Sequence, residues 1–328
     1  MEGEKILIIG GTGFIGSNLV RYLAKKGYKI AILHRKDSDL KNLYGVRFEP
    51  YIGDLAQPET IEHELSRAIQ GCRAVYNLAT CDSGLKKHFR LREVINRDAA
   101  GIVASLARKF KGLRLIHVSS SSAIGYPDRG QVADENFVFN AGFDHYALTK
   151  HEGEEAVLRQ VECGLDAVIA IPCSTIGARG IKQEQLKTFS AIIHGKIKFY
   201  PPGGLCITNI DDLVNGLYLC CECGESGRRY ILGGHNITYR SYFSEIAYAA
   251  GKSAPALPLS KIFMPLLGSA AAAVCSLLCK EPYFNRNVAL MVSKKLYYSS
   301  DLAIRELGYS IGDWKKTIKN IVDSICYA

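Results

Sequence analysis

Residues 5–21, KILIIGGTGFIGSNLVR, constrain the fold more than any other part of the sequence. Residues 6–9 form a short apolar run rich in β-branched side chains, which predicts a buried strand. Gly10, Gly13 and Gly16 follow at three-residue spacing, and the apolar pattern after them is helical. A strand, a glycine turn and a helix N-terminus let the backbone approach a pyrophosphate, which faces free N–H groups and the positive end of the helix dipole. We therefore predict a dinucleotide site at this turn.

Apolar strand patterns and helix patterns alternate through the first half of the chain. Such alternation with short loops predicts an α/β protein with a doubly wound parallel sheet, right-handed crossovers and ligands bound beyond the carboxyl ends of the strands. Further strands are expected at 29–33, 47–51, 74–79, 113–118 and 167–171, and helices at 58–69, 94–110 and 146–161.

The alternation ends at about residue 177, where helical segments, short strands and irregular loops take over. We expect a nucleotide-binding domain over 1–176 and a smaller, partly interleaved substrate-binding lobe over 177–328. Part of the second half, at about 206–234, is expected to return to the first domain.

Composition narrows the class of partner. The net charge is +9, but the basic residues form no cluster interleaved with aromatic residues, so the sequence argues against binding to nucleic acid. The 11 cysteines are an odd number and lack paired CxxC spacing, which argues against a metal site and indicates a reducing compartment. The first strand begins at residue 5 and leaves no room for a signal peptide, so we expect a cytoplasmic protein.

Tyr146 and Lys150 stand one helical turn apart and therefore share a helix face. A phenol beside an ammonium has a lowered pKa, because the positive charge favours the phenolate. Ser120, at the end of the preceding strand, can hold a substrate oxygen. Together these groups can move a proton to or from that oxygen while a nicotinamide exchanges hydride.

The chain resembles the extended short-chain dehydrogenase/reductase family over nearly its whole length. The matching segments are GGTGFIG (10–16), GDL (53–55), VYNLAT (75–80), HVSSSS (117–122), YALTK (146–150), IPCSTIG (171–177), CITNIDDLVNG (206–216) and YILGG (230–234). The resemblance implies a Rossmann fold. It also implies Tyr146 as the general acid/base, Lys150 as the ligand of the nicotinamide ribose, and Ser120 as the residue that orients the substrate oxygen. Ser121 is the alternative for this last role.

The same resemblance implies the remaining cofactor contacts. Asn77 stands where many relatives have a histidine, close to the expected cofactor. The cofactor-binding set is Gly10, Thr12, Gly13, Phe14, Ile15, Gly16, Arg35, Lys36, Asp54, Leu55, Leu78, Ala79, Thr80, Tyr146, Lys150, Pro172 and Ser174.

Cofactor choice depends on the end of the second strand. NAD-binding proteins usually place a carboxylate there, whereas this chain has Arg35, flanked by His34 and Lys36. A guanidinium suits a 2′-phosphate. We expect NADP, with NAD the less favoured alternative.

Nucleotide-sugar members of the family usually carry an arginine about six residues before the Asp211-Asp212 pair, where this chain has Leu205 and Cys206. A second family arginine is missing from 292–300. The chain looks closer to dihydroflavonol 4-reductases and 3β-hydroxysteroid dehydrogenases. We therefore expect an oxidoreductase acting on a ketone or alcohol of an apolar ring or lipid-like substrate. The alternatives are a nucleotide-sugar epimerase or dehydratase, and a non-catalytic NADP-binding regulator.

Two further expectations concern partners. Residues 262–279 carry no charge, so this stretch is either a buried wall of the substrate lobe, a helix lying on a membrane, or a short membrane span. By resemblance, the helices at 94–110 and 146–161 would pair across the axis of a homodimer.

Overall fold

The computed structural model describes residues 3–83, 85–128, 130–181, 183–266, 268–269 and 286–327. Its centre is a seven-stranded sheet in which every neighbouring pair is parallel, in the order β11-β7-β5-β4-β1-β2-β3. The strands are β1 (Lys5–Ile9), β2 (Lys29–His34), β3 (Glu49–Ile52), β4 (Cys72–Asn77), β5 (Arg114–Val118), β7 (Asp166–Pro172) and β11 (Arg229–Leu232). The order reverses between β1 and β4, which creates a crevice at their carboxyl ends.

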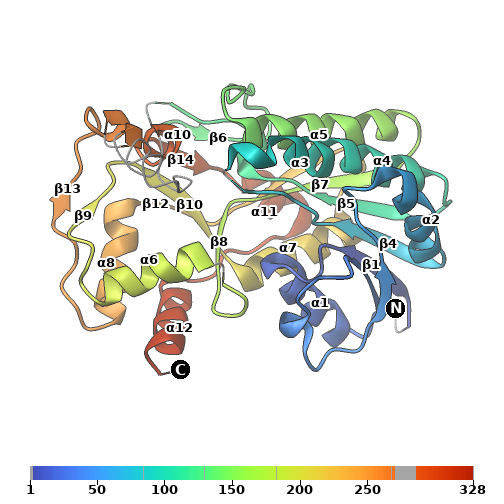
Figure 1. Ribbon diagram of the computed structural model, residues 1–328, viewed down its shortest axis with the longest axis horizontal. Coiled ribbons are helices and arrows are strands. Elements are labelled where there is room, and N and C mark those ends of the chain that lie inside the picture. Colours follow the sequence, from blue (N-terminus) through green and yellow to red (C-terminus); the bar gives the residue numbers. More distant parts are fainter. Residues whose placement is uncertain are drawn as a thin grey trace.

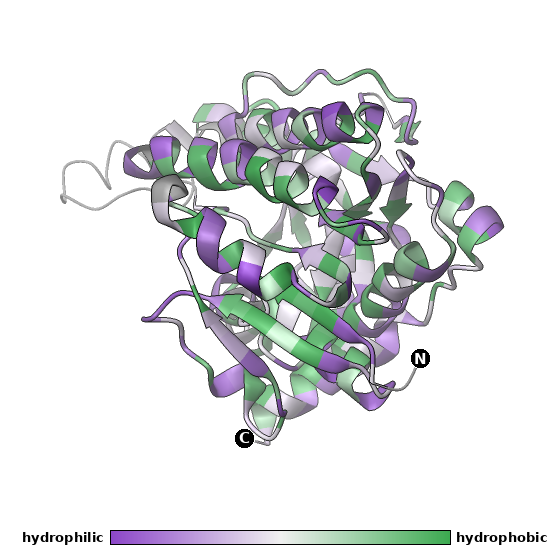
Figure 2. Ribbon diagram, turned by 90° about the vertical axis from the view of Figure 1, so that its right-hand side faces the viewer, coloured by the Kyte–Doolittle hydropathy of each residue, from purple (hydrophilic) through white to green (hydrophobic). Residues whose placement is uncertain are grey.

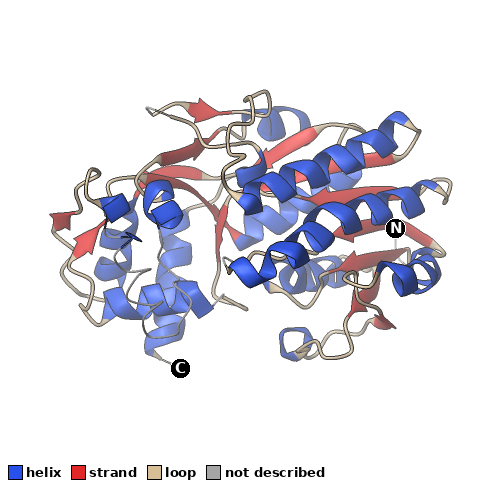
Figure 3. Cartoon of the chain, turned by 45° about the horizontal axis from the view of Figure 1, so that its top comes forward, coloured by secondary structure: helices blue, strands red, loops and turns tan. Residues whose placement is uncertain are grey.

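Helices cover both faces of this sheet, as the doubly wound pattern predicts (Figure 1). One face packs against α1 (Phe14–Lys25), α7 (Ile210–Cys223) and α11 (Asp301–Leu307). The other packs against α2 (Pro58–Ile69), α4 (Ala99–Arg108) and α5 (His145–Glu162), of which α4 and α5 lie side by side (Figure 3). Most strands of this sheet are apolar because both of their faces are buried, whereas the edge strand β3 is largely exposed. The helices carry both hydrophilic and hydrophobic residues (Figure 2).

The remaining elements form a second body at the other end of the molecule (Figure 1). Its sheet has the order β12-β10-β14-β6, with β8 paired to β10. The strands are β6 (Val132–Ala133), β8 (Ser174–Ile176), β10 (Gly204–Asn209), β12 (His235–Thr238) and β14 (Lys295–Tyr298). The helices are α6 (Gln183–Ile193), α8 (Tyr239–Ala249), α10 (Arg286–Met291) and α12 (Trp314–Cys326), and a two-stranded ribbon joins β9 (Phe199–Tyr200) to β13 (Leu257–Pro258).

The chain passes between the two sheets several times. β6 and β8 belong to the second sheet although they precede residue 177, whereas β11 belongs to the first sheet although it follows. The chain does not divide between the two sheets at a single position, so the domain boundary at residue 176/177 stays a prediction.

The single helix predicted over 94–110 is wrong in detail. The segment begins as α3 (Phe89–Arg92), widens into a π-helical turn (Glu93–Asp98) and continues as α4. The wide turn lets the backbone of α5 approach closely, since a Cβ on Gly153 would lie 2.1 Å from the carbonyl oxygen of Asn96. Such π-turns are frequent at functional sites.

Only residues 262–266 and 268–269 of the uncharged stretch 262–279 are among the described residues. There Ile262, Phe263 and Leu266 expose 81%, 59% and 64% of their surface, while Met264 is buried. Expectations about the rest of the stretch fall outside the described residues. Within the described ranges, no helix has the length and apolar character needed to cross a bilayer.

Candidate active site

The glycine turn connects β1 to α1 as predicted, and its three glycines differ in their surroundings. Gly10 has φ +80°, and a Cβ there would lie 2.9 Å from the carbonyl carbon of Leu78. A Cβ on Gly16 would lie 2.2 Å from the carbonyl oxygen of Gly10. Gly13, the N-cap of α1, has room for a Cβ, whose nearest contact would be 3.5 Å away. The fold itself requires Gly10 and Gly16, whereas Gly13 leaves open the space where a phosphate would approach.

A cavity of about 690 Å³ lies at the carboxyl ends of β1 to β4. The sequence-predicted residues that line it are Gly10, Thr12, Gly13, Arg35, Asp54, Leu55, Leu78, Ala79 and Thr80. Residues from four separate segments thus meet around one space, at the point where the strand order reverses. The open face of Gly13 and the free helix end fit a dinucleotide there.

The other predicted cofactor contacts are not among the residues that line this cavity. Phe14, Ile15 and Gly16 form the first turn of α1. Lys36 lines an adjoining cavity that also touches Arg35 and Asp54. Pro172 ends β7 and Ser174 begins β8, with Tyr146 and Lys150 on α5.

Polar side chains gather where β2 and β3 end. The guanidinium side chain of Arg35 is 59% exposed and lies 3.5 Å from the carboxylate of Asp37. Ser38, which the sequence reasoning missed, lines the same cavity. Asp54 accepts a hydrogen bond from the backbone N–H of Ala56 at 2.9 Å, which fixes its own turn. This end of the cavity can take a charged or hydroxyl-bearing group.

Asn77 fixes the turn that follows β4. Its side chain is buried at the end of β4, and Oδ1 accepts a hydrogen bond from the backbone N–H of Ala79 at 3.2 Å. The amide therefore fixes the Leu78–Ala79 turn, whose residues line the cavity.

Tyr146 is the second residue of α5, and the helix start is held by Asp144. Oδ1 of Asp144 accepts hydrogen bonds from the backbone N–H groups of Tyr146 at 2.9 Å and Ala147 at 3.4 Å. Its Oδ2 accepts from the hydroxyl of Tyr126 at 2.6 Å. The cap therefore fixes the backbone that carries the phenol of Tyr146.

Lys150 lies one turn further along α5 and is only 1% exposed. Its Nζ donates a hydrogen bond to the carbonyl oxygen of Val118 at 2.9 Å, which ties it to the end of β5. Burial lowers the pKa of Lys150 to about 8, while the carboxylate of Glu154 acts in the opposite direction. The group is therefore an ammonium at neutral pH that can be deprotonated under mildly alkaline conditions.

The serine run begins one residue after the carbonyl group that Lys150 contacts. Ser120 caps a short 3₁₀ turn over Ser121–Ala123, and its Oγ accepts from the backbone N–H of Ser122 at 3.2 Å. Ser119 is buried, and within the described residues its Oγ has no hydrogen-bond partner. The choice between Ser120 and Ser121 as the residue that orients a substrate oxygen stays a prediction.

Sequence reasoning also missed Asn96, which lies in the π-turn. Its amide hydrogen-bonds to the backbone of Cys81 through both Oδ1 and Nδ2, at 2.8 and 3.1 Å. Nδ2 also donates to Oγ1 of Thr149, the residue before Lys150, at 3.1 Å. Asn96 thus links the rim of the cofactor cavity to the catalytic helix. The available sequence signal was an asparagine inside a helical pattern of apolar residues.

On the substrate side, Leu205 and Cys206 occupy β10 where nucleotide-sugar enzymes usually have arginine. Both side chains are buried, and Cys206 Sγ accepts from the backbone N–H of Gly234 at 3.3 Å. Lys294, close to the second missing arginine, is bound to Asp128 at 2.6 Å.

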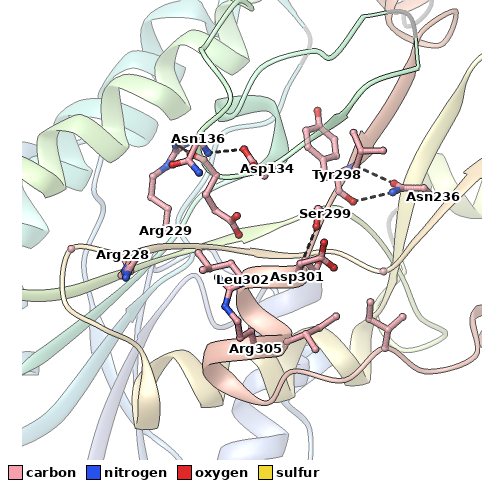
Figure 4. Close-up of a pocket in the computed structure, with 17 residues that line it drawn as sticks. Asp134, Asn136, Arg228, Arg229, Asn236, Tyr298, Ser299, Asp301, Leu302 and Arg305 are labelled. Atoms are coloured by element: carbon pink, nitrogen blue, oxygen red, sulfur yellow. Dashed lines mark hydrogen bonds between the residues drawn. The ribbon is translucent and has the colours of Figure 1, made fainter.

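A wider cavity of about 960 Å³ lies at the β11 edge of the main sheet (Figure 4). None of the predicted site residues lines it. Each of its three arginines lies near a carboxylate: Arg228 is 2.8 Å from Glu225, Arg229 is 2.8 Å from Glu154, and the exposed Arg305 is 3.9 Å from Glu306. The cavity at the β1/β4 crevice instead holds the glycine turn and the nine predicted cofactor-binding residues named above.

The chain is similar to known proteins both in sequence and in fold. The model described as the NAD dependent epimerase/dehydratase family matches residues 6–233. The chain is 28% identical over 328 residues to a "Putative dihydroflavonol 4-reductase" from Synechocystis sp., covering 96% of this chain and 92% of that protein. It is 27% identical to "Sterol demethylase protein B" from Methylococcus capsulatus, covering 77% and 76%. The crystal structure of gox2253 superposes with a TM-score of 0.85 at 27% identity, covering 99% and 98%.

Proposed function

The chain belongs to the NAD-dependent epimerase/dehydratase family of NAD(P)-dependent enzymes, and we propose that it interconverts a ketone and an alcohol on a mostly apolar ring or lipid-like substrate. The observation that carries the proposal is the burial of Lys150 in α5, one turn after Tyr146 and against the end of β5. This arrangement suits proton transfer at a substrate oxygen.

In the proposed mechanism NADP, when bound, supplies or accepts the hydride. The hydroxyl of Tyr146 gives a proton to the substrate oxygen during reduction, and the phenolate form of Tyr146 accepts that proton during oxidation. The ammonium of Lys150 favours the phenolate form of Tyr146 and binds the nicotinamide ribose. Ser120 donates a hydrogen bond that orients the substrate oxygen. The Asp144 cap and the Val118 carbonyl hold the two α5 residues in place.

The preference for an apolar substrate is supported by Leu205 and Cys206. A diphosphate placed against these buried side chains would lack the guanidinium partner that offsets its loss of water. The relatives named for a dihydroflavonol and for a sterol point in the same direction. NADP is favoured over NAD because Arg35 lines the cavity where NAD-binding proteins place a carboxylate.

The experiment follows oxidation of NADPH with a panel of flavonoid, steroid and terpenoid ketones. UDP- and dTDP-sugars are tested in parallel by analysis of the sugar products, because epimerisation and dehydration cause no net oxidation of the cofactor. We expect turnover with at least one apolar ketone and none with the nucleotide sugars. Conversion of nucleotide sugars alone would instead support the alternative hypothesis of a nucleotide-sugar epimerase or dehydratase.

Replacing Tyr146 by Phe separates an enzyme from a non-catalytic NADP-binding regulator. Loss of one general acid/base lowers turnover by about 10²- to 10⁴-fold. NADPH binding, followed by its fluorescence, should persist. The control is Tyr248→Phe, since Tyr248 lies on α8 and is exposed. Unchanged activity of the Tyr146→Phe protein would refute the assigned acid/base.

We also propose that the enzyme is cytoplasmic and touches a membrane through residues 262–279. The exposed Ile262, Phe263 and Leu266 support this contact, because apolar side chains in contact with water favour burial in an apolar phase. The proposal predicts partial recovery with membranes after fractionation. Complete recovery in the detergent-free supernatant would contradict it.

A further inference from the structure

A line of buried charges leads away from Lys150 toward the β11 edge of the sheet. Glu154 follows Lys150 by one turn on the inner face of α5, and the two residues are 2% and 1% exposed. Oε2 of Glu154 lies 2.8 Å from Nη2 of Arg229 on β11. Nη1 of Arg229 donates to the backbone carbonyl of Glu135 at 3.0 Å, so the guanidinium contacts both α5 and the loop after β6. Arg229 also lines the wider cavity, and its side chain is 20% exposed (Figure 4).

Stability alone gives a weak reason for this pair. Removing two charges from water costs several kcal/mol per ion, and a buried ion pair often stabilises no more than apolar residues of similar size. The second carboxylate oxygen, Oε1 of Glu154, has no hydrogen-bond partner among the described residues. The Glu154–Arg229 pair is therefore better explained by its effect on the charge of a neighbouring side chain.

That neighbour is Lys150, and few charged or titratable groups face it. On α5 these are Tyr146 and Glu154, with Arg229 of β11 acting behind Glu154. From β5 comes His117, whose pKa is held well below its usual range by burial and then by the charge of Lys150, so the imidazole is neutral. Within the described part of the chain, Glu154 is the carboxylate that favours the ammonium form of Lys150.

We propose that Glu154, held by Arg229, is a positioning residue that keeps Lys150 protonated and so sets the upper pH limit of cofactor binding and turnover. The inference rests on the proposed function, because it takes Lys150 as the lysine that binds the cofactor. Its structural basis is the shared buried face of α5 and the contact of Glu154 with β11.

The test measures the dissociation constant of NADPH by fluorescence between about pH 6 and pH 10, a range that brackets lysine deprotonation at this site. In the unmodified protein, binding should weaken as Lys150 loses its proton. In Glu154→Gln the midpoint of this loss should move to lower pH by about 1 unit, the usual effect of one nearby opposite charge. Glu154→Asp keeps a carboxylate at this position, so its midpoint should lie close to that of the unmodified protein.

The matched control is Glu155→Gln on the same helix. Glu155 is 53% exposed and lies 3.7 Å from His151, so its removal should leave the midpoint in place. Should Glu154→Gln fail to fold, the pair Glu154→Gln with Arg229→Met removes both buried charges together, which proteins tolerate better than removing one. This double variant should shift the midpoint in the same direction by a smaller amount.

Lys150→Met separates this inference from the proposed function. If that variant still shows the alkaline loss of binding, Lys150 is not the cofactor lysine and the proposed assignment fails. If Lys150→Met removes the loss but Glu154→Gln leaves its midpoint unchanged, the inference alone fails and the Glu154–Arg229 pair is only a structural tie. In the expected case, adding Glu154→Gln to Lys150→Met has no further effect.

Discussion

The three glycines of the β1–α1 turn have different physical roles. Gly10 and Gly16 are required by backbone contacts inside the protein, to Leu78 and to Gly10 respectively. Gly13 meets no such obstacle. A motif that looks uniform in the sequence therefore divides into two residues that build the turn and one that leaves space for a ligand.

Gly13→Ala should consequently weaken NADPH binding with little loss of stability. The added methyl group fits the protein but occupies the approach of the phosphate. Gly16→Ala is the comparison, because its Cβ would overlap the carbonyl oxygen of Gly10 and should lower the melting temperature. Fluorescence titration and thermal unfolding of both variants measure the difference. Equal NADPH affinity in Gly13→Ala and the unmodified protein would contradict the placement of the cofactor.

Arg35 decides cofactor choice at the scale of one side chain. Arg35→Ala should weaken NADPH binding by about 10- to 100-fold, because hydrogen bonds to charged groups contribute about 1.5–3 kcal/mol each. NADH binding should change little, since NADH lacks the 2′-phosphate. Arg47→Ala removes the same charge from an exposed position outside the cofactor cavity and serves as the control. A parallel loss of NADPH and NADH affinity would argue against a 2′-phosphate contact.

At the scale of elements, the start of α5 decides where Tyr146 lies. Asp144→Ala removes the acceptor of two backbone N–H groups and of the buried Tyr126 hydroxyl, and should cost about 2–4 kcal/mol of the free energy of unfolding. Because Tyr146 follows directly, turnover should also fall.

The matched comparison is Asp313→Ala at the start of α12, where Asp313 accepts from the backbone N–H of Lys315 at 2.9 Å. That variant loses only a helix cap, so it should lose less stability than Asp144→Ala, about 1 kcal/mol, and keep its turnover number. Denaturant unfolding and steady-state kinetics of both variants check the prediction. If the two lose activity equally, the Asp144 cap has no special role in placing Tyr146.

The helical segment before α5 has a feature that the sequence pattern does not predict. The apolar spacing over 94–110 predicts a helix and does not reveal the π-turn at Glu93–Asp98. That turn depends on contacts between distant segments, namely those of Asn96 with Cys81 and Thr149. Hydrophobic periodicity records which face of a helix is buried. It carries no information about the hydrogen bonds that a residue of the helix makes to segments elsewhere in the chain.

At the scale of the whole molecule, α4 and α5 lie side by side on one face of the sheet (Figure 3). We expect two copies of the chain to pair through this face. Sedimentation at micromolar concentration should therefore give twice the chain mass of 36.0 kDa. A single species of 36.0 kDa would contradict the homodimer.

The sequence by itself determined the class of the sheet, the place of the nucleotide turn and the Tyr146–Lys150 pair. These features depend on local spacing, namely glycines three residues apart, apolar runs and residues one helical turn apart. The tertiary structure decided which segments share a cavity, which glycine faces the ligand space and which carboxylate faces Lys150. Glu154 and Arg229 are 75 positions apart in the chain, and only the packing of α5 against the sheet brings their charges to 2.8 Å. Interactions of this kind depend on distance in space, which a single sequence does not specify.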